Sequence, residues 1–160
     1  MLKGQINIHF IISLIIFFGI IAYIAYFLIT FNPTYRYEVE ENLLYMKAYQ
    51  ISEFLIKDSG KPLNWNSTEY KRIGLASTPY ILRESKINAL KELCNTTDET
   101  KIKKLSEAFG LDNNAFEIYI NYLDGTNLVN CSFGYVGKKG VIKRVAIFNN
   151  NLVEVIVYVS

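Results

Sequence analysis

The sequence predicts an α+β fold in which a long N-terminal helix and two shorter helices accompany a four-stranded antiparallel sheet. Three observations support this prediction. A run without charged side chains extends from Lys3 to Arg36, a helical period of apolar residues follows it, and a period of two begins at Ala115. The 160 residues leave room for one membrane segment and one modest domain.

The uncharged run is long enough to cross a membrane. From Ile8 to Phe31 it has 24 residues, or roughly 36 Å of helix at about 1.5 Å per residue. The hydrocarbon layer is about 30 Å thick, whereas a cleaved secretory signal has an apolar core of only about 7–15 residues. We therefore predict a retained transmembrane helix, with a kink or break at Asn32-Pro33 because proline removes a backbone donor.

Few charges flank this span, and they set its orientation. Lys3 and the initiator amine precede it, while Arg36 is followed by Glu38, Glu40 and Glu41. Under the positive-inside rule the N-terminus lies in the cytoplasm and the domain lies outside the cell, with the reverse orientation as the alternative. The expected location is therefore the cell membrane, crossed once.

The segment over residues 34–58 reads as an amphipathic helix. One apolar stripe recurs at helical spacing: Leu44, Ala48, Ile51 and Leu55. The string DSGKP then ends the helix, with glycine near its C-cap and proline soon after. Residues 59–80 are expected to be irregular, with Trp65 buried in the core or, alternatively, marking a binding surface.

Two further helices are predicted over residues 83–94 and 97–110, and the second opens with a Thr/Asp cap. From Ala115 onward, apolar and polar residues alternate. The pattern predicts four strands joined by short turns: 116–122, 128–136, 141–148 and 152–159. Because the connecting loops are short, we expect an antiparallel meander with a helix packed on it.

The cysteines and three N-x-[ST] sequons suit an extracellular domain. Cys94 ends a predicted helix and Cys131 lies in a predicted strand, 37 positions away. A disulfide between them is the first expectation, and two buried free thiols are the alternative. The sequons are candidate glycosylation sites, although an asparagine-rich chain also produces this short motif by chance. They are Asn66-Ser67-Thr68, Asn95-Thr96-Thr97 and Asn130-Cys131-Ser132.

Composition argues against several classes of function. The net charge of +2, from 17 basic and 15 acidic side chains, predicts no nucleic-acid partner. We expect no enzyme, since the only histidine, His9, lies in the apolar run and the acids are spread over solvated helical faces. No metal and no cofactor are expected. Asp112-Asn113-Asn114 reads as a turn, because it lacks the ligand spacing of a calcium loop.

The string Lys3-Gly4-Gln5, directly before the apolar helix, resembles the class III signal peptide of archaeal type IV pilin-like proteins. In that family a prepilin peptidase cuts on the cytoplasmic side, and the apolar helix is kept. The resemblance implies cleavage between Gly4 and Gln5. It also implies three parts: a cytoplasmic leader of residues 1–4, a transmembrane and assembly helix of residues 5–32, and an extracytoplasmic pilin-like domain of residues 33–160.

The string GQINIHF is similar to the family pattern GQ-x-S-x-E-F, with two departures. Asn7 stands where serine is usual, and His9 stands where glutamate is usual. In the family, that glutamate helps recruit a subunit by pairing with the N-terminal amine of a neighbour. An imidazole can accept a hydrogen bond from an amine, but a weaker one than a carboxylate accepts. Alternatively, His9 only reaches toward the lipid headgroups from the membrane end of its helix.

A second block resembles the same family, in the strings SEFLIKDSGKPLNW, RIGLAS and LRESKINAL. The resemblance implies a structural, pilin-like subunit of an archaeal type IV pilus or a related surface filament, and the departure at His9 fits a minor or tip-located subunit. Its partners would be other pilin-like subunits, met through the N-terminal helix, the prepilin peptidase and membrane lipid. The alternative is a single-pass, membrane-tethered binding module that does not polymerise. A third, weaker alternative is an enzyme whose site forms only in three dimensions.

Overall fold

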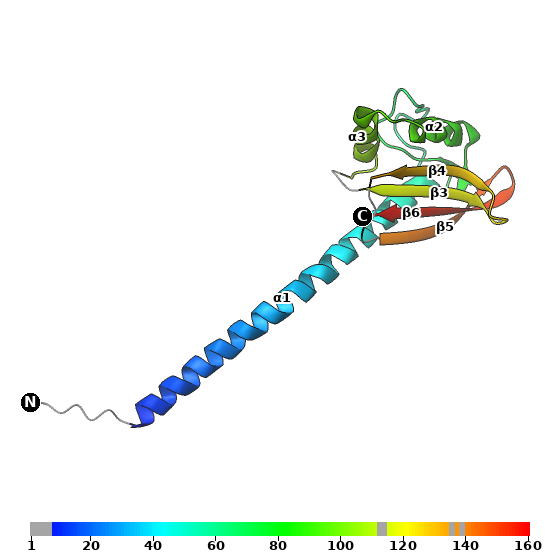
Figure 1. Cartoon of the computed structure of the whole chain (residues 1–160). Coiled ribbons are helices and arrows are strands. Elements are labelled where there is room, and N and C mark those ends of the chain that lie inside the picture. Colours follow the sequence, from blue (N-terminus) through cyan, green and yellow to red (C-terminus); the bar gives the residue numbers. More distant parts are fainter. Residues whose placement is uncertain (1–7, 112–114, 135–136, 138–139) are drawn as a thin grey trace, which may run out of the picture. The chain divides into compact units, whose positions relative to one another are not determined.

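The computed structural model describes residues 8–111, 115–134, 137 and 140–160, with the backbone alone described over 31–37. It has the predicted α+β architecture (Figure 1). Its helices are α1 (Ile8–Lys57), α2 (Glu84–Cys94) and α3 (Glu99–Ala108). Its strands are β1 (Ala76–Thr78), β2 (Ile81–Leu82), β3 (Phe116–Tyr122), β4 (Asn127–Phe133), β5 (Gly140–Phe148) and β6 (Asn151–Val159). The chain divides into two compact units after Glu40, which we call the N-terminal unit and the outer unit.

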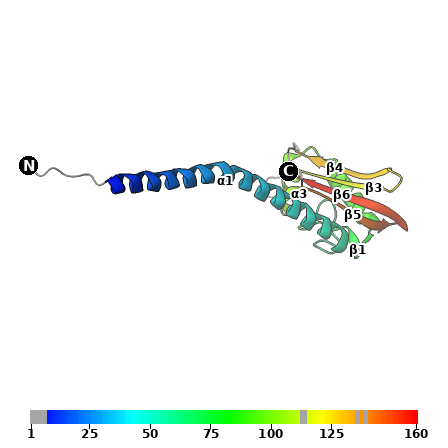
Figure 2. The ribbon, with the colours of Figure 1, turned by 90° about the horizontal axis from the view of Figure 1, so that it is seen from below.

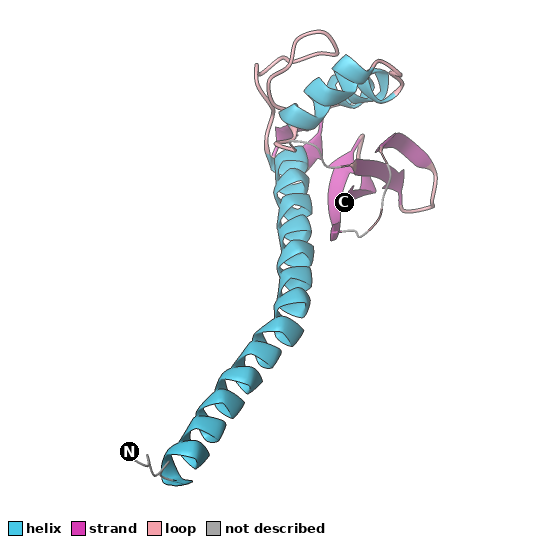
Figure 3. Cartoon of the chain, turned by 60° about the vertical axis from the view of Figure 1, so that its left-hand side comes forward, coloured by secondary structure: helices cyan, strands magenta, loops and turns pink. Residues whose placement is uncertain are grey.

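In the N-terminal unit, α1 carries a candidate membrane span over Ile8–Thr30. These 23 residues have a mean hydropathy of 2.6, and none of their side chains is buried by the rest of the described chain. Figure 3 shows α1 as one continuous helix, as predicted, and its backbone is helical through Pro33. Of the kink or break that was predicted at Asn32-Pro33, the break is therefore absent. Proline removes one hydrogen bond, but local adjustment of the backbone allows long helices to retain it.

In the outer unit, the C-terminal part of α1 supplies part of the core. Ala48, Ile51 and Leu55 of the predicted stripe are fully buried, whereas Leu44 is only partly buried. Helix α3 begins as predicted, because the Asp98 side chain accepts a hydrogen bond from the backbone N–H of Thr100 at 2.9 Å. Figure 1 shows α2 and α3 together on one side of the sheet.

The sheet corrects the predicted meander. It has six strands in the order β1-β2-β5-β6-β3-β4, and it is mixed because β2 runs parallel to β5. Strand β3 pairs with both β4 and β6, so β4 lies at one edge and does not pair with β5 (Figure 2). Short loops did not dictate sequential pairing, because the strongly apolar β6 gains more burial between two strands than at an edge.

Strands β1 and β2 were not predicted from the sequence. Strand β1 lies in the segment 59–80, which was expected to be irregular, and β2 lies between that segment and the helix predicted over residues 83–94. They are only three and two residues long. A tight turn joins them, and Tyr80 in it has a φ of 68°. The carbonyl of Tyr80 accepts a hydrogen bond from the N–H of Ile147 in β5 at 2.8 Å, which adds this hairpin to the sheet. Such short strands show no period of two, so the sequence pattern could not predict them.

Candidate functional site

The predicted processing site and the substituted assembly position lie at the start of the chain. Gly4 and Gln5 fall outside the described residues. His9 lies in the first turn of α1 with its side chain exposed, and its carbonyl accepts a hydrogen bond from the Ser13 hydroxyl at 2.9 Å. That bond is made to the backbone carbonyl of His9 and does not involve its imidazole.

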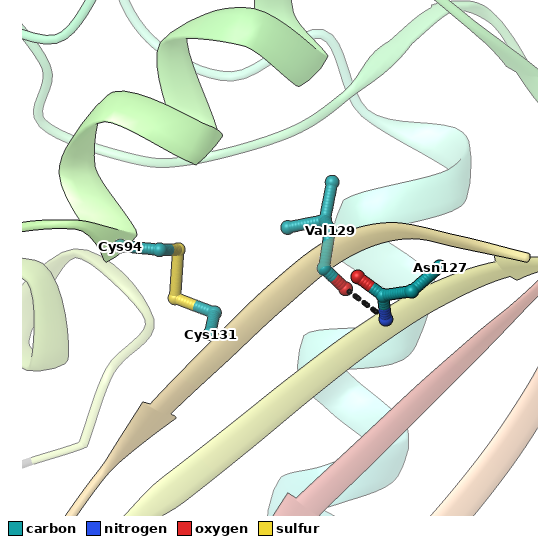
Figure 4. The surroundings of a disulfide bond; sticks show 4 residues. All are labelled: Cys94, Asn127, Val129 and Cys131. Atoms are coloured by element: carbon teal, nitrogen blue, oxygen red, sulfur yellow. Dashed lines mark hydrogen bonds between the residues drawn. A yellow bond between two sulfur atoms is a disulfide. The ribbon is translucent and has the colours of Figure 1, made fainter.

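Cys94 and Cys131 form a disulfide that joins the end of α2 to strand β4 (Figure 4). Their Cα atoms are 4.9 Å apart, and Cys131 is fully buried. On the same strand, the Asn127 side chain donates hydrogen bonds to the Asn121 side chain at 2.8 Å and to the Val129 carbonyl at 3.3 Å. The edge strand is therefore held by a covalent bond from α2 as well as by its pairing with β3.

The three sequons differ in their surroundings, although each asparagine is exposed. Asn66 lies in a loop, where its Oδ1 accepts hydrogen bonds from the Thr68 N–H, the Thr68 hydroxyl and the Glu69 N–H. Asn95 caps the C-terminus of α2. Asn130 lies within β4, next to the disulfide at Cys131. A glycan on Nδ2 of Asn66 would leave its Oδ1 free to keep the turn.

The loop after α1 is fixed by polar contacts around Asp58 and Lys86. The Asp58 carboxylate accepts a hydrogen bond from the Gly60 N–H at 2.7 Å and pairs with the Arg72 guanidinium. Partial burial tends to raise the pKa of Asp58, but the Gly60 N–H and the Arg72 guanidinium outweigh it and hold that pKa below its usual range. Lys86 is buried, and its Nζ donates to the carbonyls of Ser59 and Ala76.

Trp65 belongs to this loop and not to a binding surface. It is 3% exposed, and its Nε1 donates a hydrogen bond to the Gly74 carbonyl at 2.8 Å. Both polar and apolar parts of the indole are thus satisfied inside the outer unit. Of the two predicted roles for Trp65, burial in the core is therefore confirmed.

Two of the hollows on the outer unit are lined by described residues. One, of about 480 Å³, runs along the exposed face of α1, and its lining includes Leu43, Met46 and Phe54. The other, of about 590 Å³, lies between the β3–β4 and β5–β6 turns and is lined by a mixture of polar and apolar side chains. Both turns were predicted from the sequence. The second hollow was not, because this hollow forms only when β3 lies beside β6.

Within the described ranges, no group of three or more His, Cys, Asp or Glu side chains is arranged to hold a metal ion. The string Asp112-Asn113-Asn114 lies outside those ranges. Comparison of the chain with protein-family models, with curated proteins and with solved structures finds no match. Function is therefore inferred from the sequence and from the geometry within each unit.

Proposed function

We propose that this chain is a pilin-like structural subunit, minor or tip-located, of an archaeal type IV pilus or a related cell-surface filament. The observation that carries the proposal is the candidate membrane span of α1, a predominantly apolar stretch whose 23 residues are all exposed within the chain. An apolar helix surface of that length requires lipid or other helices around it. Its position directly after Lys3-Gly4-Gln5 is the arrangement that a retained, processed assembly helix would have.

In this proposal the helix anchors the subunit with its N-terminus in the cytoplasm and then packs against the helices of other subunits. The outer unit faces the extracellular side, where a disulfide such as Cys94–Cys131 persists. The polypeptide has a structural role and no catalytic one. Its partners are the prepilin peptidase, membrane lipid and other pilin-like subunits.

Mass spectrometry of the N-terminus, on protein taken from native membranes, tests the proposal. A mature chain that begins at Gln5 is the expected result. An intact Met1 would overturn the filament proposal and favour a tethered module. Gly4→Val is expected to prevent cleavage because the peptidase cuts after a small residue, whereas Lys57→Gln, at the far end of α1, leaves cleavage unchanged.

The membrane-tethered binding module remains the second candidate, and His9 favours it. An imidazole supplies no carboxylate for the amine of an incoming subunit. His9→Glu restores that carboxylate, and Asn7→Ser, which restores the other departure without adding charge, is the matched control. If His9→Glu increases the amount of the chain in sheared filaments while Asn7→Ser does not, the subunit proposal is supported. Absence of both variants from filaments would favour the module.

A further inference from the structure

We propose that the hollow between the β3–β4 and β5–β6 turns binds a neutral saccharide through its hydroxyl groups. Strands β3 and β6 are antiparallel neighbours, with Tyr122 opposite Val153. The turn that follows β3 and the turn that precedes β6 therefore lie side by side, and the hollow of about 590 Å³ forms between them. This inference goes beyond the proposed function, because binding here requires neither cleavage nor assembly.

Both turns are held in place by bonds within the chain. The Tyr122 N–H donates to the Thr126 carbonyl at 2.9 Å, and the Gly125 N–H donates to the Tyr122 carbonyl at 2.9 Å. In the other turn, Asn149 and Asn150 have φ values of 48° and 63°, the left-handed backbone that a tight hairpin turn needs. A ligand entering the hollow would therefore order little of the protein, which favours binding.

Some polar side chains that line the hollow have hydrogen-bonding capacity beyond the bonds they make within the two turns. The Asp124 carboxylate accepts a hydrogen bond from the Thr126 N–H at 2.8 Å, and the bonds from that N–H and from the Thr126 hydroxyl lower the pKa of Asp124. A carboxylate has room for about four such bonds, so acceptor capacity remains. Asn151 donates to the Asn149 carbonyl at 3.2 Å, which leaves its own oxygen to accept. Among the described residues, no partner is found for the Asn150 amide.

The same lining selects the class of ligand. None of the described residues that line the hollow is a Lys, Arg or His, and the negative charge of Asp124 would repel an anion. A single carboxylate with neutral amides is too few charged ligands for a tightly held calcium ion. A saccharide hydroxyl can both donate to Asp124 and accept from the Asn150 amide. Leu123 and Leu152, which are 64% and 50% exposed, offer an apolar surface for the C–H face of a sugar ring.

The test is saturation-transfer NMR on the full chain in lipid nanodiscs, because detergents with sugar headgroups would compete. The probes are lactose, a mannose disaccharide and N,N′-diacetylchitobiose, with sialyllactose as the anionic comparison. We expect saturable binding of at least one neutral probe. Asn150→Gly keeps a turn-forming Asn-Gly pair but removes the amide, and it should weaken binding about tenfold.

Asp124→Asn keeps an acceptor for the Thr126 N–H while removing the charge, and it should also weaken binding about tenfold. Asn149→Gly alters the same turn as Asn150→Gly at a residue that does not line the hollow, and it should bind like the unaltered protein. Buried Trp65 fluorescence verifies that each variant is folded. The proposal is overturned if no neutral probe binds saturably, if binding survives both Asn150→Gly and Asp124→Asn, or if sialyllactose binds more tightly than lactose.

Discussion

A Cβ atom added to Gly140 would lie 2.3 Å from the backbone carbonyl carbon of Leu44. Strand β5 and helix α1 therefore meet backbone to backbone at this point of the outer unit. No side chain other than hydrogen allows that approach, since real Cβ contacts are never so short. The seam between α1 and the sheet consequently depends on the absence of a side chain as well as on apolar burial.

Gly140→Ala should destabilise the outer unit by about 1–3 kcal/mol, because the methyl group meets backbone that cannot rotate away. The free energy of unfolding can be followed by the fluorescence of Trp65, the single tryptophan, during urea titration of the full chain in micelles. Lys143→Ala, on the exposed side of the same strand, is the control and should change stability by less than about 0.5 kcal/mol. Equal stability of both variants would contradict the close approach.

Removing the disulfide should lower the free energy of unfolding by about 2–4 kcal/mol, because the bond closes a loop across 37 positions. The double variant Cys94→Ala/Cys131→Ala measures this without leaving a reactive thiol. Treatment of the unaltered protein with reductant should give the same loss, and reductant should have no effect on the double variant. A double variant as stable as the unaltered protein would show that the bond constrains little.

Asp58 should make the outer unit lose stability in acid. Its pKa is lower in the folded chain than the ordinary value of 3.8, so the unfolded state binds the proton more tightly. The stabilisation is complete above that ordinary pKa and is lost as the pH falls through the lower, folded pKa. Asp58→Asn should therefore flatten the fall in stability between about pH 5 and pH 2.

The control for this pH dependence is Glu92→Gln, which removes an exposed carboxylate elsewhere on the same unit. Both variants lose one negative charge, so any difference between them reflects the contacts that Asp58 makes with Gly60 and Arg72. If the two variants show the same slope of unfolding free energy against pH, those contacts do not lower the pKa.

Glycans are predicted on Asn66 and Asn95, and not on Asn130. The first two lie in a loop and at a helix end, whereas Asn130 lies within paired strand β4 beside a buried disulfide. Glycopeptide mass spectrometry of protein from native membranes measures occupancy at each site. Thr68→Ala and Thr97→Ala should each remove one glycan, because they destroy the sequon without replacing the asparagine. Occupancy at Asn130, or at none of the three, would contradict the prediction.

The elements with a strong local period could be predicted from the sequence. The apolar stripe through Ile51 and Leu55 predicts the C-terminal part of α1. Alternation predicts β3 and β5, and the apolar run after the turn at Asn149-Asn150-Asn151 predicts β6, each to within a residue or two. Such patterns depend only on which side of an element is buried. The single long N-terminal helix was also predicted, whereas the alternative of a break at Pro33 is wrong because a local proline rule does not include the stability of the long helical segments on either side.

The order of the strands could not be predicted in the same way. Strand order depends on contacts between residues far apart in the chain, and short loops favoured a meander. One signal was present, since Val155, Ile156 and Val157 are apolar without alternation, as in a strand covered on both faces and flanked on both sides. Because the saccharide-sized hollow depends on the pairing of β3 with β6, the site was missed for the same reason as the order.

Helix α1 contributes residues to both units, and its C-terminal part, from Glu41 to Lys57, belongs to the outer unit. Within the outer unit, the buried side chains of Ala48, Ile51 and Leu55 and the backbone seam at Gly140 hold this part of the helix in the core. A proteolytic cut that releases an intact outer unit has to fall inside the helix, near Glu40. A cut after Lys57 would instead remove part of the core and release a fragment unable to keep its fold.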